Sequence, residues 1–334
     1  MARVLVLATT TGYQTRSFGE AAARLGVELV FATDRCHLID DPWQDGAVAI
    51  RFYDEDASVA AIVDSTRTRP IDGILTVGDR PTVIAARVAR ALGLPGNPPD
   101  AAAAAKHKRL TRERLRAAGL LQPRASSVQP RAFPVVVKPV ALSGSRGVMR
   151  ANDQRDLDAA IERLRALLQS PDIRAERNEA HDEILVEEFI PGHEYALDGV
   201  LHRGELHVFA LFDKPDPLDG PFFEETIYVT TDDHRDAIVG AVRDAAHALG
   251  LHHGPIHAEV RVNDTGVYVL EVAARPIGGL CARAIRFFRT ANPESRIPLE
   301  ELLLRHARGE DVREWRRESD ASGVMMIPIP RRGI

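Results

Sequence analysis

Apolar runs alternate with amphipathic segments along the first hundred residues. The runs RVLVLAT, VELVFAT and DGILTVG predict strands over residues 3–9, 27–33 and 72–78. Segments with helical periodicity follow them, over residues 17–26, 54–63 and 81–93. Because strands and helices alternate in this way, we expect a parallel sheet with helices on both faces.

The pattern changes after LPGNPPD. A long helix is predicted over residues 101–118, a buried strand at 135–137, an amphipathic helix at 153–169 and a polar surface loop at 171–183. A strand at 184–190 precedes two predicted hairpins, with turns at Arg203–Gly204 and at Asn263–Gly266. The fold class is therefore predicted as α/β and α+β. The expected parts are an N-terminal α/β domain (1–98), a small lobe with a Gly-rich loop (99–185), a large antiparallel lobe (186–309) and a C-terminal segment (310–334).

Composition excludes several classes of partner. The net charge of −5 argues against nucleic acid and against an acidic membrane surface. No apolar run is long enough to cross a bilayer, and the start MARVLVLATT resembles a first strand more than a signal peptide. The two cysteines, Cys36 and Cys281, give neither a disulfide framework nor a zinc pattern. We therefore expect a cytoplasmic protein.

Lysine is rare in this chain, although basic residues are common. Of the 43 basic residues, four are lysines: Lys106, Lys108, Lys138 and Lys214. Lys138 ends the buried run Val135–Val137, where a charged ammonium is costly unless an anion pairs with it. The Gly- and Ser-rich loop 143–147 that follows can wrap an anion with its backbone N–H groups. A flexible surface hairpin explains this patch equally well.

Two further patches are ambiguous in isolation. Lys108 lies one helical turn before Arg112, a pattern more typical of a solvated basic face. The stretch LVEEFIPGHEYALDG could sandwich a planar base and offer Glu194 to ribose hydroxyls, but an edge strand with exposed glutamates is the commoner reading.

The hairpin HAEVRVNDTGVYVLEVAAR carries two carboxylates among valines and alanines. Pairing Val262 with Val267 and counting outward sets Glu259 opposite Leu270, so a bulge or a small register offset would bring Glu259 and Glu271 onto one face. Two adjacent carboxylates repel each other, and a divalent cation between them relieves the repulsion. Arg275 is a candidate clamp for a carboxylate or phosphate, or else a surface arginine.

The order of these patches resembles the ATP-grasp superfamily. The two lysines, the Gly-rich loop, VEEFIPGHEY and the hairpin ending in EVAARPIGG carry the resemblance, which runs from about Pro98 to about Leu304. The preceding lobe is similar to the α/β domain that usually stands in front. Within the superfamily, the chain most resembles the carboxylate–amine ligases, including L-amino-acid ligases that make dipeptides.

The resemblance implies that ATP activates a carboxylate as an acyl phosphate and that an amine then forms an amide, with release of ADP and phosphate. The alternatives are a ligase of a nucleotide or bicarbonate pathway and a non-catalytic ATP-binding module.

The resemblance also implies a role for each candidate residue. The expected ATP contacts are Lys108, Lys138, Ser143, Gly144, Ser145, Gly147, Glu187, Phe189, Ile190 and Glu194, the last four around adenine and ribose. Glu259 and Glu271 would hold Mg²⁺ or Mn²⁺. Lys138 and Arg275 are the expected catalytic residues. Substrate contacts are expected from Arg275, Gly278, Gly279 and His257. Independently of the resemblance, the Pro- and Gly-rich loop FDKPDPLDGPFFEET suits recognition of an amine through Glu224 and Glu225. His257 and Glu225 are candidate general bases, although a core or surface role is the commoner one for each.

Two departures from the family pattern bear on these expectations. Ala273 stands where many members carry an asparagine that binds the second metal, so either water replaces that ligand or a second Mg²⁺ is held more loosely. The chain ends in GVMMIPIPRRGI, a strand entering a turn, which raises the expectation of an absent terminal segment. The sequence leaves open both substrates, the general base, the number of metal ions and whether the protein forms a homodimer.

Overall fold

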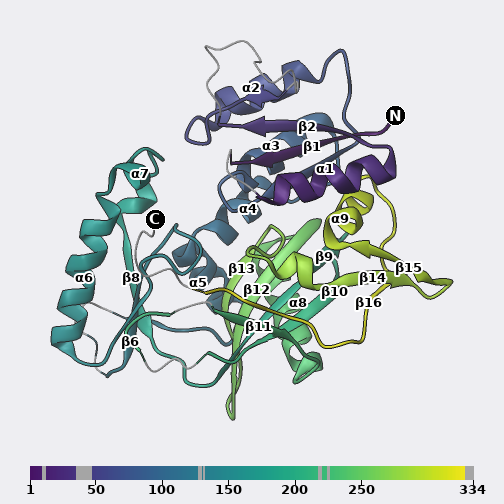
Figure 1. Ribbon diagram of the computed structural model, residues 1–334. Coiled ribbons are helices and arrows are strands. Elements are labelled where there is room, and N and C mark those ends of the chain that lie inside the picture. The colour runs from purple at the N-terminus through teal and green to yellow at the C-terminus, as the bar shows by residue number, and fades with distance from the viewer. Residues whose placement is uncertain are drawn as a thin grey trace, which may run out of the picture.

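The computed structural model describes residues 1–9, 13–34, 47–126, 130, 132–216, 220–223 and 226–327. Glu224, Glu225 and Cys36 lie outside these residues. Three lobes surround a central gap in Figure 1: the N-terminal sheet, a small lobe that carries α6, and a large sheet. No helix among the described residues combines the length and the apolar character needed to cross a membrane.

The N-terminal lobe is a parallel sheet with helices on both faces, as predicted. Its strand order is β3-β2-β1-β4. The strands are β1 (Arg3–Ala8), β2 (Glu28–Thr33), β3 (Val48–Ala49) and β4 (Gly73–Val77). The helices are α1 (Tyr13–Leu25), α2 (Glu55–Ser65) and α3 (Thr82–Leu92). Leu5 and Leu7 pack in the core with α2 and α3, whereas Val4 and Val6 pack with α1, because successive strand residues point to opposite faces.

The large sheet has six strands in the order β13-β12-β9-β10-β11-β17. They are β9 (His193–His202), β10 (Glu205–Lys214), β11 (Ile227–Thr230), β12 (Gly254–Asn263), β13 (Gly266–Ala273) and β17 (Gly323–Met325). Helix α8 (Arg235–Leu249) covers one face, where Tyr195 and Leu197 point. The opposite face carries Ala196 and Val200, which join the core that contains α1.

That shared core also contains α9 (Leu299–Ala307), which packs on α1 and β4. A small sheet of β15, β14 and β16 lies beside α9, formed by β14 (Arg286–Arg289), β15 (Asn292–Pro298) and β16 (Trp315–Arg317). The apolar core is therefore continuous between the N-terminal lobe and the large sheet.

The small lobe is a four-stranded antiparallel sheet backed by a helix. Its order is β5-β8-β6-β7. The elements are β5 (Ala125–Ser126), β6 (Val135–Pro139), β7 (Met149–Ala151), α6 (Gln154–Leu168) and β8 (Ile184–Glu188). Leu157, Ile161 and Leu164 of α6 pack on Val135 and Val137.

Two sequence predictions were wrong. The helix expected over 101–118 is two helices, α4 (Pro99–Lys106) and α5 (Lys108–Ala117), broken at His107 in an extended conformation. The break lets the Lys108 amide donate to the Val140 carbonyl, 2.9 Å away. The segment 171–183 contains the short helix α7 (Pro171–Arg174) and a 3₁₀ turn (Glu179–Asp182), because buried Ile173 and His181 anchor an otherwise polar stretch.

The predicted domain boundaries stay a prediction. Helices α4 and α5, which those boundaries group with the small lobe, bury their apolar side chains against α8 and the large sheet. Strand β17, from the predicted C-terminal segment, pairs with β11 of the same sheet.

Candidate active site

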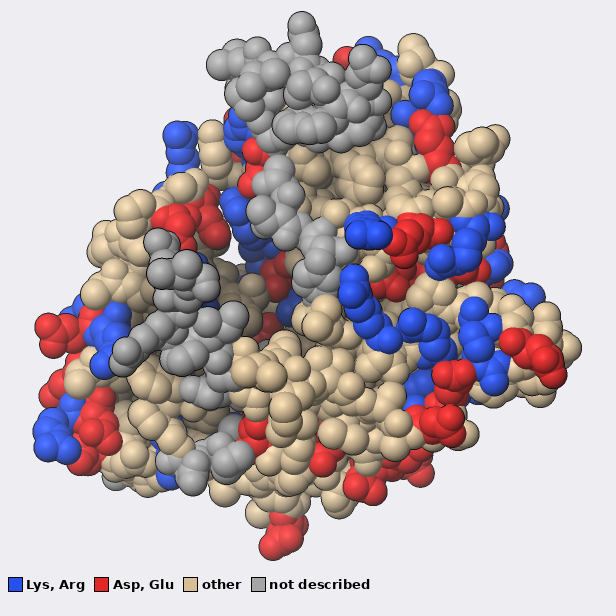
Figure 2. All heavy atoms as spheres, in the orientation of Figure 1, with Lys and Arg blue, Asp and Glu red and all other residues tan. Residues whose placement is uncertain are grey.

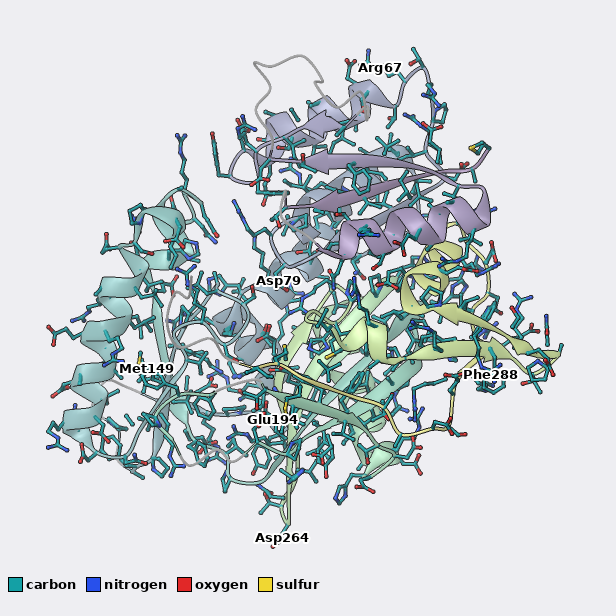
Figure 3. The ribbon with its side chains drawn as sticks, in the orientation of Figure 1. Arg67, Asp79, Met149, Glu194, Asp264 and Phe288 are labelled. Carbon is teal, nitrogen blue, oxygen red and sulfur yellow. The ribbon has the colours of Figure 1, made fainter. Side chains whose placement is uncertain are left out.

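A cavity of about 400 Å³ lies where the three lobes meet. Its walls include Asp79 from the N-terminal lobe, Lys138 from the small lobe, and Glu259 and Glu271 from the large sheet. The described surface is hollowed between the lobe of α6 and the N-terminal lobe, with acidic and basic side chains near the hollow (Figure 2). Figure 3 shows Asp79 at the edge of the N-terminal lobe that faces the gap.

The two hairpin glutamates lie directly opposite each other on the cavity face. Val262 pairs with Val267 as predicted, and the register shifts after Val260, so that Glu259 pairs with Glu271. The bulge leaves the Leu270 carbonyl free of the ladder, and Arg112 donates to it over 2.8 Å. The predicted shared face for both carboxylates is therefore present.

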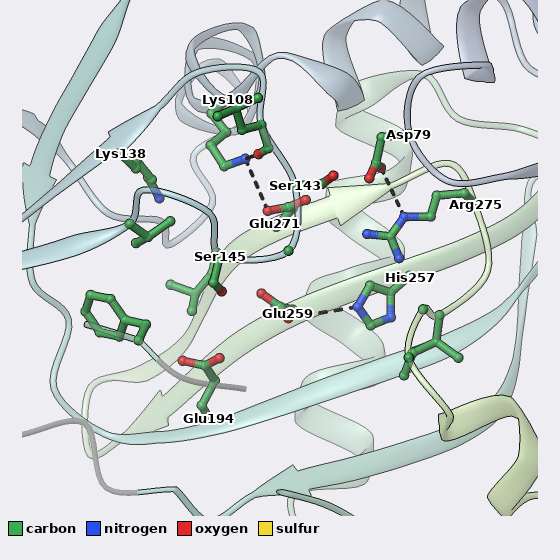
Figure 4. Close-up of a pocket in the computed structure, with 18 of the residues that line it drawn as sticks. Asp79, Lys108, Lys138, Ser143, Ser145, Glu194, His257, Glu259, Glu271 and Arg275 are labelled. Carbon is green, nitrogen blue, oxygen red and sulfur yellow. Dashed lines mark hydrogen bonds and ion pairs between the residues drawn. The ribbon is translucent and has the colours of Figure 1, made fainter. Parts of the chain in front are cut away.

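Two lysines approach this face from the opposite wall (Figure 4). Lys108, at the start of α5, donates to the Leu142 carbonyl at 2.7 Å and pairs with Glu271 at 3.5 Å. Lys138, at the end of β6, is buried against Glu187. Burial lowers the pKa of Lys138 to about 8, and the neighbouring Glu187 only partly offsets this effect.

Glu187 is held from two sides. Arg112 donates to its two carboxylate oxygens at 3.0 and 3.2 Å, and Lys138 pairs with it. Burial alone would raise the pKa of Glu187, but the two cations outweigh it and keep the pKa below its usual value. Both carboxylate oxygens thus face protein cations. The adenine contact expected of Glu187 does not require these partners.

Glu194 is the centre of a second buried ion cluster. Lys214 donates to one carboxylate oxygen at 2.5 Å, and Arg261 donates to the other at 3.0 and 2.9 Å. Lys214 also reaches Glu259 at 3.1 Å. The second cluster is thereby joined to the paired glutamates, and Glu194, which also lines the cavity, accepts three hydrogen bonds from cations at the place of the expected ribose contact.

The Gly-rich loop forms one rim of the cavity. Ser143, Gly144 and Ser145 line it, and Gly144 has a φ of 64° with open space where a side chain would point. Gly147, also expected at the phosphates, does not line the cavity. A Cβ atom there would come within 2.8 Å of Leu164, so this glycine permits the loop to pack against α6.

The expected base-binding stretch is only partly in the cavity. Ile190 lines the cavity, and its carbonyl accepts a hydrogen bond from Arg261 at 2.7 Å. Phe189 does not line it; this ring packs against the guanidinium groups of Arg150 and Arg261 and stacks on Phe223. Phe223, which belongs to the predicted substrate loop FDKPDPLDGPFFEET, lines the cavity.

At the far end of the cavity, Arg275 contacts the N-terminal lobe. Arg275 donates from Nε to Asp79 at 3.0 Å, and Gly278 and Gly279 line the cavity beside it. Asp79 follows β4, and β1 and β4 are the neighbouring strands at which the strand order reverses. Ligands of open α/β sheets bind at the carboxyl ends of strands at such a point.

Behind this end, His257 and Asp198 are neighbours in the strand register of β12 and β9. Asp198 is 1% exposed; its Oδ1 accepts from the Ile277 amide at 2.9 Å, and its Oδ2 has no partner. Burial raises the pKa of Asp198 to about 8, and the hydrogen bond only partly offsets this. Burial, together with nearby Arg275 and Lys214, lowers the pKa of His257 well below its usual value.

Several residues of the site had no role predicted from sequence, among them Asp79, Arg112, Asp198, Lys214 and Arg261. Lys214 could have been found, because the lysine scarcity that drew attention to Lys138 applies equally to it. Arg261 could also have been found, since it follows Glu259 by two residues and so shares its strand face. Asp79 could not, because its partner Arg275 lies 196 positions further along the chain.

The predicted substrate loop, FDKPDPLDGPFFEET, is only partly described. Asp216 accepts hydrogen bonds from the Thr226 and Ile227 amides, both at 2.9 Å, which closes the base of the loop. Its tip reaches the small lobe, where the Pro221 carbonyl accepts from the Arg150 amide at 2.9 Å. Glu224 and Glu225, the two residues expected to contact substrate, lie outside the described residues.

Comparison with known families agrees with this architecture. The family described as "ATP-grasp domain" matches residues 131–284, and "ATP-grasp N-terminal domain" matches residues 19–96. Among solved structures, an L-amino acid ligase from Bacillus licheniformis is similar with a TM-score of 0.76 and 27% identity, over 99% of this chain and 81% of that one. A phosphoribosylglycinamide synthetase from Anaerococcus prevotii, 18% identical with a TM-score of 0.67 over 98% of this chain and 81% of that chain, shows a shared fold.

Curated relatives match over part of their length. Dapdiamide A synthase of Enterobacter agglomerans is 28% identical over 60% of this chain and 47% of its own. An alanine–anticapsin ligase of Bacillus amyloliquefaciens is 26% identical over 62% of this chain and 49% of its own. The chain thus spans about half the length of these relatives. The two matched domain families, in order along a chain with this arrangement of lobes, place the protein in the ATP-grasp superfamily.

Proposed function

We propose that the protein is an ATP-dependent carboxylate–amine ligase that joins two small molecules, at least one of them an amino acid, through an amide bond. The proposal rests on one observation: two oppositely charged walls face each other across one cavity. Lys108 and Lys138 form a cationic wall, and the directly paired Glu259 and Glu271 form an anionic wall. A triphosphate with a divalent cation has the charge pattern that fits between them.

The present ion pairs indicate how the site would accept the nucleotide. Glu271 pairs with Lys108 and Glu259 with Lys214, so the carboxylates that would bind a cation are neutralised by lysines. Mg²⁺ or Mn²⁺ bound at Glu259 and Glu271 would neutralise charge that develops on the phosphates. Lys108 and Lys138 would then turn to the phosphate oxygens. The Ser143–Ser145 segment would add backbone N–H donors at the same place.

The Asp79–Arg275 pair supports an amino acid as one substrate. An α-amino acid presents a carboxylate and an ammonium group on neighbouring atoms. A guanidinium beside a carboxylate offers the complementary charges. Because Asp79 comes from the N-terminal lobe, this lobe would contribute to substrate selection.

The proposed reaction has two steps. A carboxylate oxygen of the acid attacks the γ-phosphorus of ATP, and the bond to ADP breaks, giving an acyl phosphate. The amine nitrogen then attacks the acyl carbon; phosphate leaves, the nitrogen loses its proton, and the amide remains. The residues contribute position and charge stabilisation. His257 lines the cavity at the substrate end, and its lowered pKa leaves the ring neutral, which makes it a candidate for accepting that proton.

A screen of phosphate release from MgATP over pairs of amino acids tests the proposal. We expect release only when a cognate acid and amine are both present, with one ADP and one amide product formed per phosphate. A non-catalytic ATP-binding module would bind ATP without release. A ligase of a bicarbonate or nucleotide pathway would release phosphate with bicarbonate or a ribonucleotide amine in place of the amino acids. Either outcome would reject the proposed substrates.

A further inference from the structure

Three histidines converge at a place that is separate from the large cavity. His202 ends β9, His253 lies between α8 and β12, and His306 is in α9. Nitrogen atoms of the three rings all lie within 4.8 Å of one another. Three segments spread over more than 100 positions of the chain therefore bring three imidazoles to one point.

The rings have unsatisfied nitrogens. His202 Nδ1, His253 Nδ1 and His306 Nε2 are buried and have no hydrogen-bond partner, and the His253 and His306 residues are only 8% and 1% exposed. Leaving one buried polar atom unsatisfied costs about 1–3 kcal/mol. Three such atoms in one cluster indicate a missing common partner.

The chemistry of the cluster favours a cation. No Asp or Glu is in the group, so imidazole nitrogens are the donors that the cluster offers to a cation. The His306 ring also has a hydrogen bond with the Leu201 backbone. Metal-bound histidines commonly use their second nitrogen in this way, which fixes the orientation of the ring.

We propose that His202, His253 and His306 form a binding site for a divalent transition-metal cation of the Zn²⁺ class. Imidazole nitrogens suit Zn²⁺, Co²⁺, Ni²⁺ and Cu²⁺, whereas Mg²⁺ prefers oxygen ligands. Three histidines leave the fourth tetrahedral position to water. The His253 and His306 rings are stacked at 4.5 Å with an interplanar angle of 25°, so the rings must tilt for their lone pairs to converge on one ion.

The location indicates a structural role for this ion. A second cavity, lined by His253 and His306, also contacts β4 and the segment Pro95–Asn97 of the N-terminal lobe. Asn97 Oδ1 accepts hydrogen bonds from the His252 and His253 amides at 2.7 and 3.0 Å. A metal ion would fix α9, the end of β9 and this turn where the N-terminal lobe meets the large sheet.

Titration of the chelator-treated full chain with Zn²⁺ alone, against a chromophoric chelator, tests the site. We expect one equivalent of Zn²⁺ per chain at the histidine cluster, and about 100-fold weaker binding in His253→Gln and in His306→Gln. His181→Gln is a matched control, because His181 is a buried histidine paired with Glu176 at 3.0 Å outside the cluster. Co²⁺ should give intensified visible absorption bands that these two variants lose and the control keeps.

Two further variants cover misfolding of the buried variants and Zn²⁺ binding in the large cavity. If the buried variants do not fold, His202→Gln, at a half-buried strand end, should weaken binding by the same factor. A Glu259→Gln/Glu271→Gln double variant should retain the Zn²⁺ equivalent, which separates this site from the nucleotide cavity and makes the result independent of ligase activity. Zn²⁺ binding that is absent, or unchanged by all the histidine substitutions, would overturn the proposal and leave a stacked cluster of neutral rings.

Discussion

At the scale of single residues, the proposed function requires charged side chains to change partners when MgATP binds. Glu259 and Glu271 are paired with lysines in the described structure, and the same carboxylates are proposed to take the cation of MgATP. Replacing either carboxylate by a neutral side chain should therefore lower activity more than replacing a carboxylate that only stabilises the fold.

We therefore predict that Glu259→Gln and Glu271→Gln each lower kcat/KM for ATP by about 100-fold or more, because each removes a negative charge that stabilises the bound cation. Steady-state phosphate release at saturating Mg²⁺ measures the effect. Glu205→Gln, an exposed glutamate at the start of β10, is the control. Near wild-type activity in both cavity variants would remove these residues from the metal site.

Lys138 gives a prediction for the dependence on pH. Its pKa is lowered to about 8, so the ammonium group is present below about pH 8 and is lost as the pH rises above that value. We expect kcat/KM for ATP to be flat between about pH 6.5 and 7.5 and to fall up to tenfold per unit above about pH 8. Lys138→Arg should move this limit upward, because a guanidinium stays charged throughout. A profile of Lys138→Arg that falls at the same pH as that of the wild type would assign the titration to another group.

At the scale of elements, the hairpin β12–β13 was the best-predicted part of the site. Valine alternation predicted its register at the turn, and the expected bulge or offset that brings Glu259 and Glu271 onto one face is present. The break at His107 was missed because its cause is a hydrogen bond to Val140, which no local pattern contains. The roles expected of Phe189 and Gly147 came from family resemblance, whereas their packing depends on Arg150, Arg261 and α6.

Asp198 links two elements, since it lies on β9 and holds the amide of Ile277 in the loop after β13. Its folded-state pKa, about 8, exceeds the ordinary value of 3.8, so the folded protein binds the additional proton between these limits. This contribution to the free energy of unfolding is fully present below about pH 4 and is lost as the pH rises through about 8, at no more than about 1.4 kcal/mol per pH unit.

Asp198→Asn keeps one oxygen acceptor and removes the titration. We expect the stability of the wild type relative to this variant to fall as the pH rises from about 4 to about 8, measured by urea unfolding at several pH values. Asp244→Asn, an exposed aspartate on α8, should show no such trend. Parallel pH curves for the wild type and Asp198→Asn would contradict a protonated Asp198.

At the scale of the whole molecule, the site is assembled from three lobes, and contacts between lobes were the part that sequence patterns could not supply. The elements within each lobe could be predicted from periodicity, because the apolar face of a strand or helix is visible in its local sequence. The Asp79–Arg275 pair joins residues from separate lobes, and no periodic pattern connects them.

Asp79→Asn tests whether the N-terminal lobe selects the substrate. Loss of a charge-assisted hydrogen bond costs about 1.5–3 kcal/mol, so we expect KM for the amino acid to rise by about tenfold to 100-fold while KM for ATP changes little. Asp72→Asn, at the other end of β4, is the control in the same lobe. An unchanged KM for the amino acid would limit Asp79 to a structural role between the lobes.

The proposed acyl phosphate can be tested by following one oxygen atom. With the acid substrate labelled with ¹⁸O in its carboxylate, an acyl phosphate formed between the lobes must transfer one labelled oxygen to the released phosphate. We expect one ¹⁸O per phosphate by mass spectrometry, with phosphate released only when ATP, a divalent cation, the acid and the amine are all present. Amide formation accompanied by unlabelled phosphate would contradict this expectation.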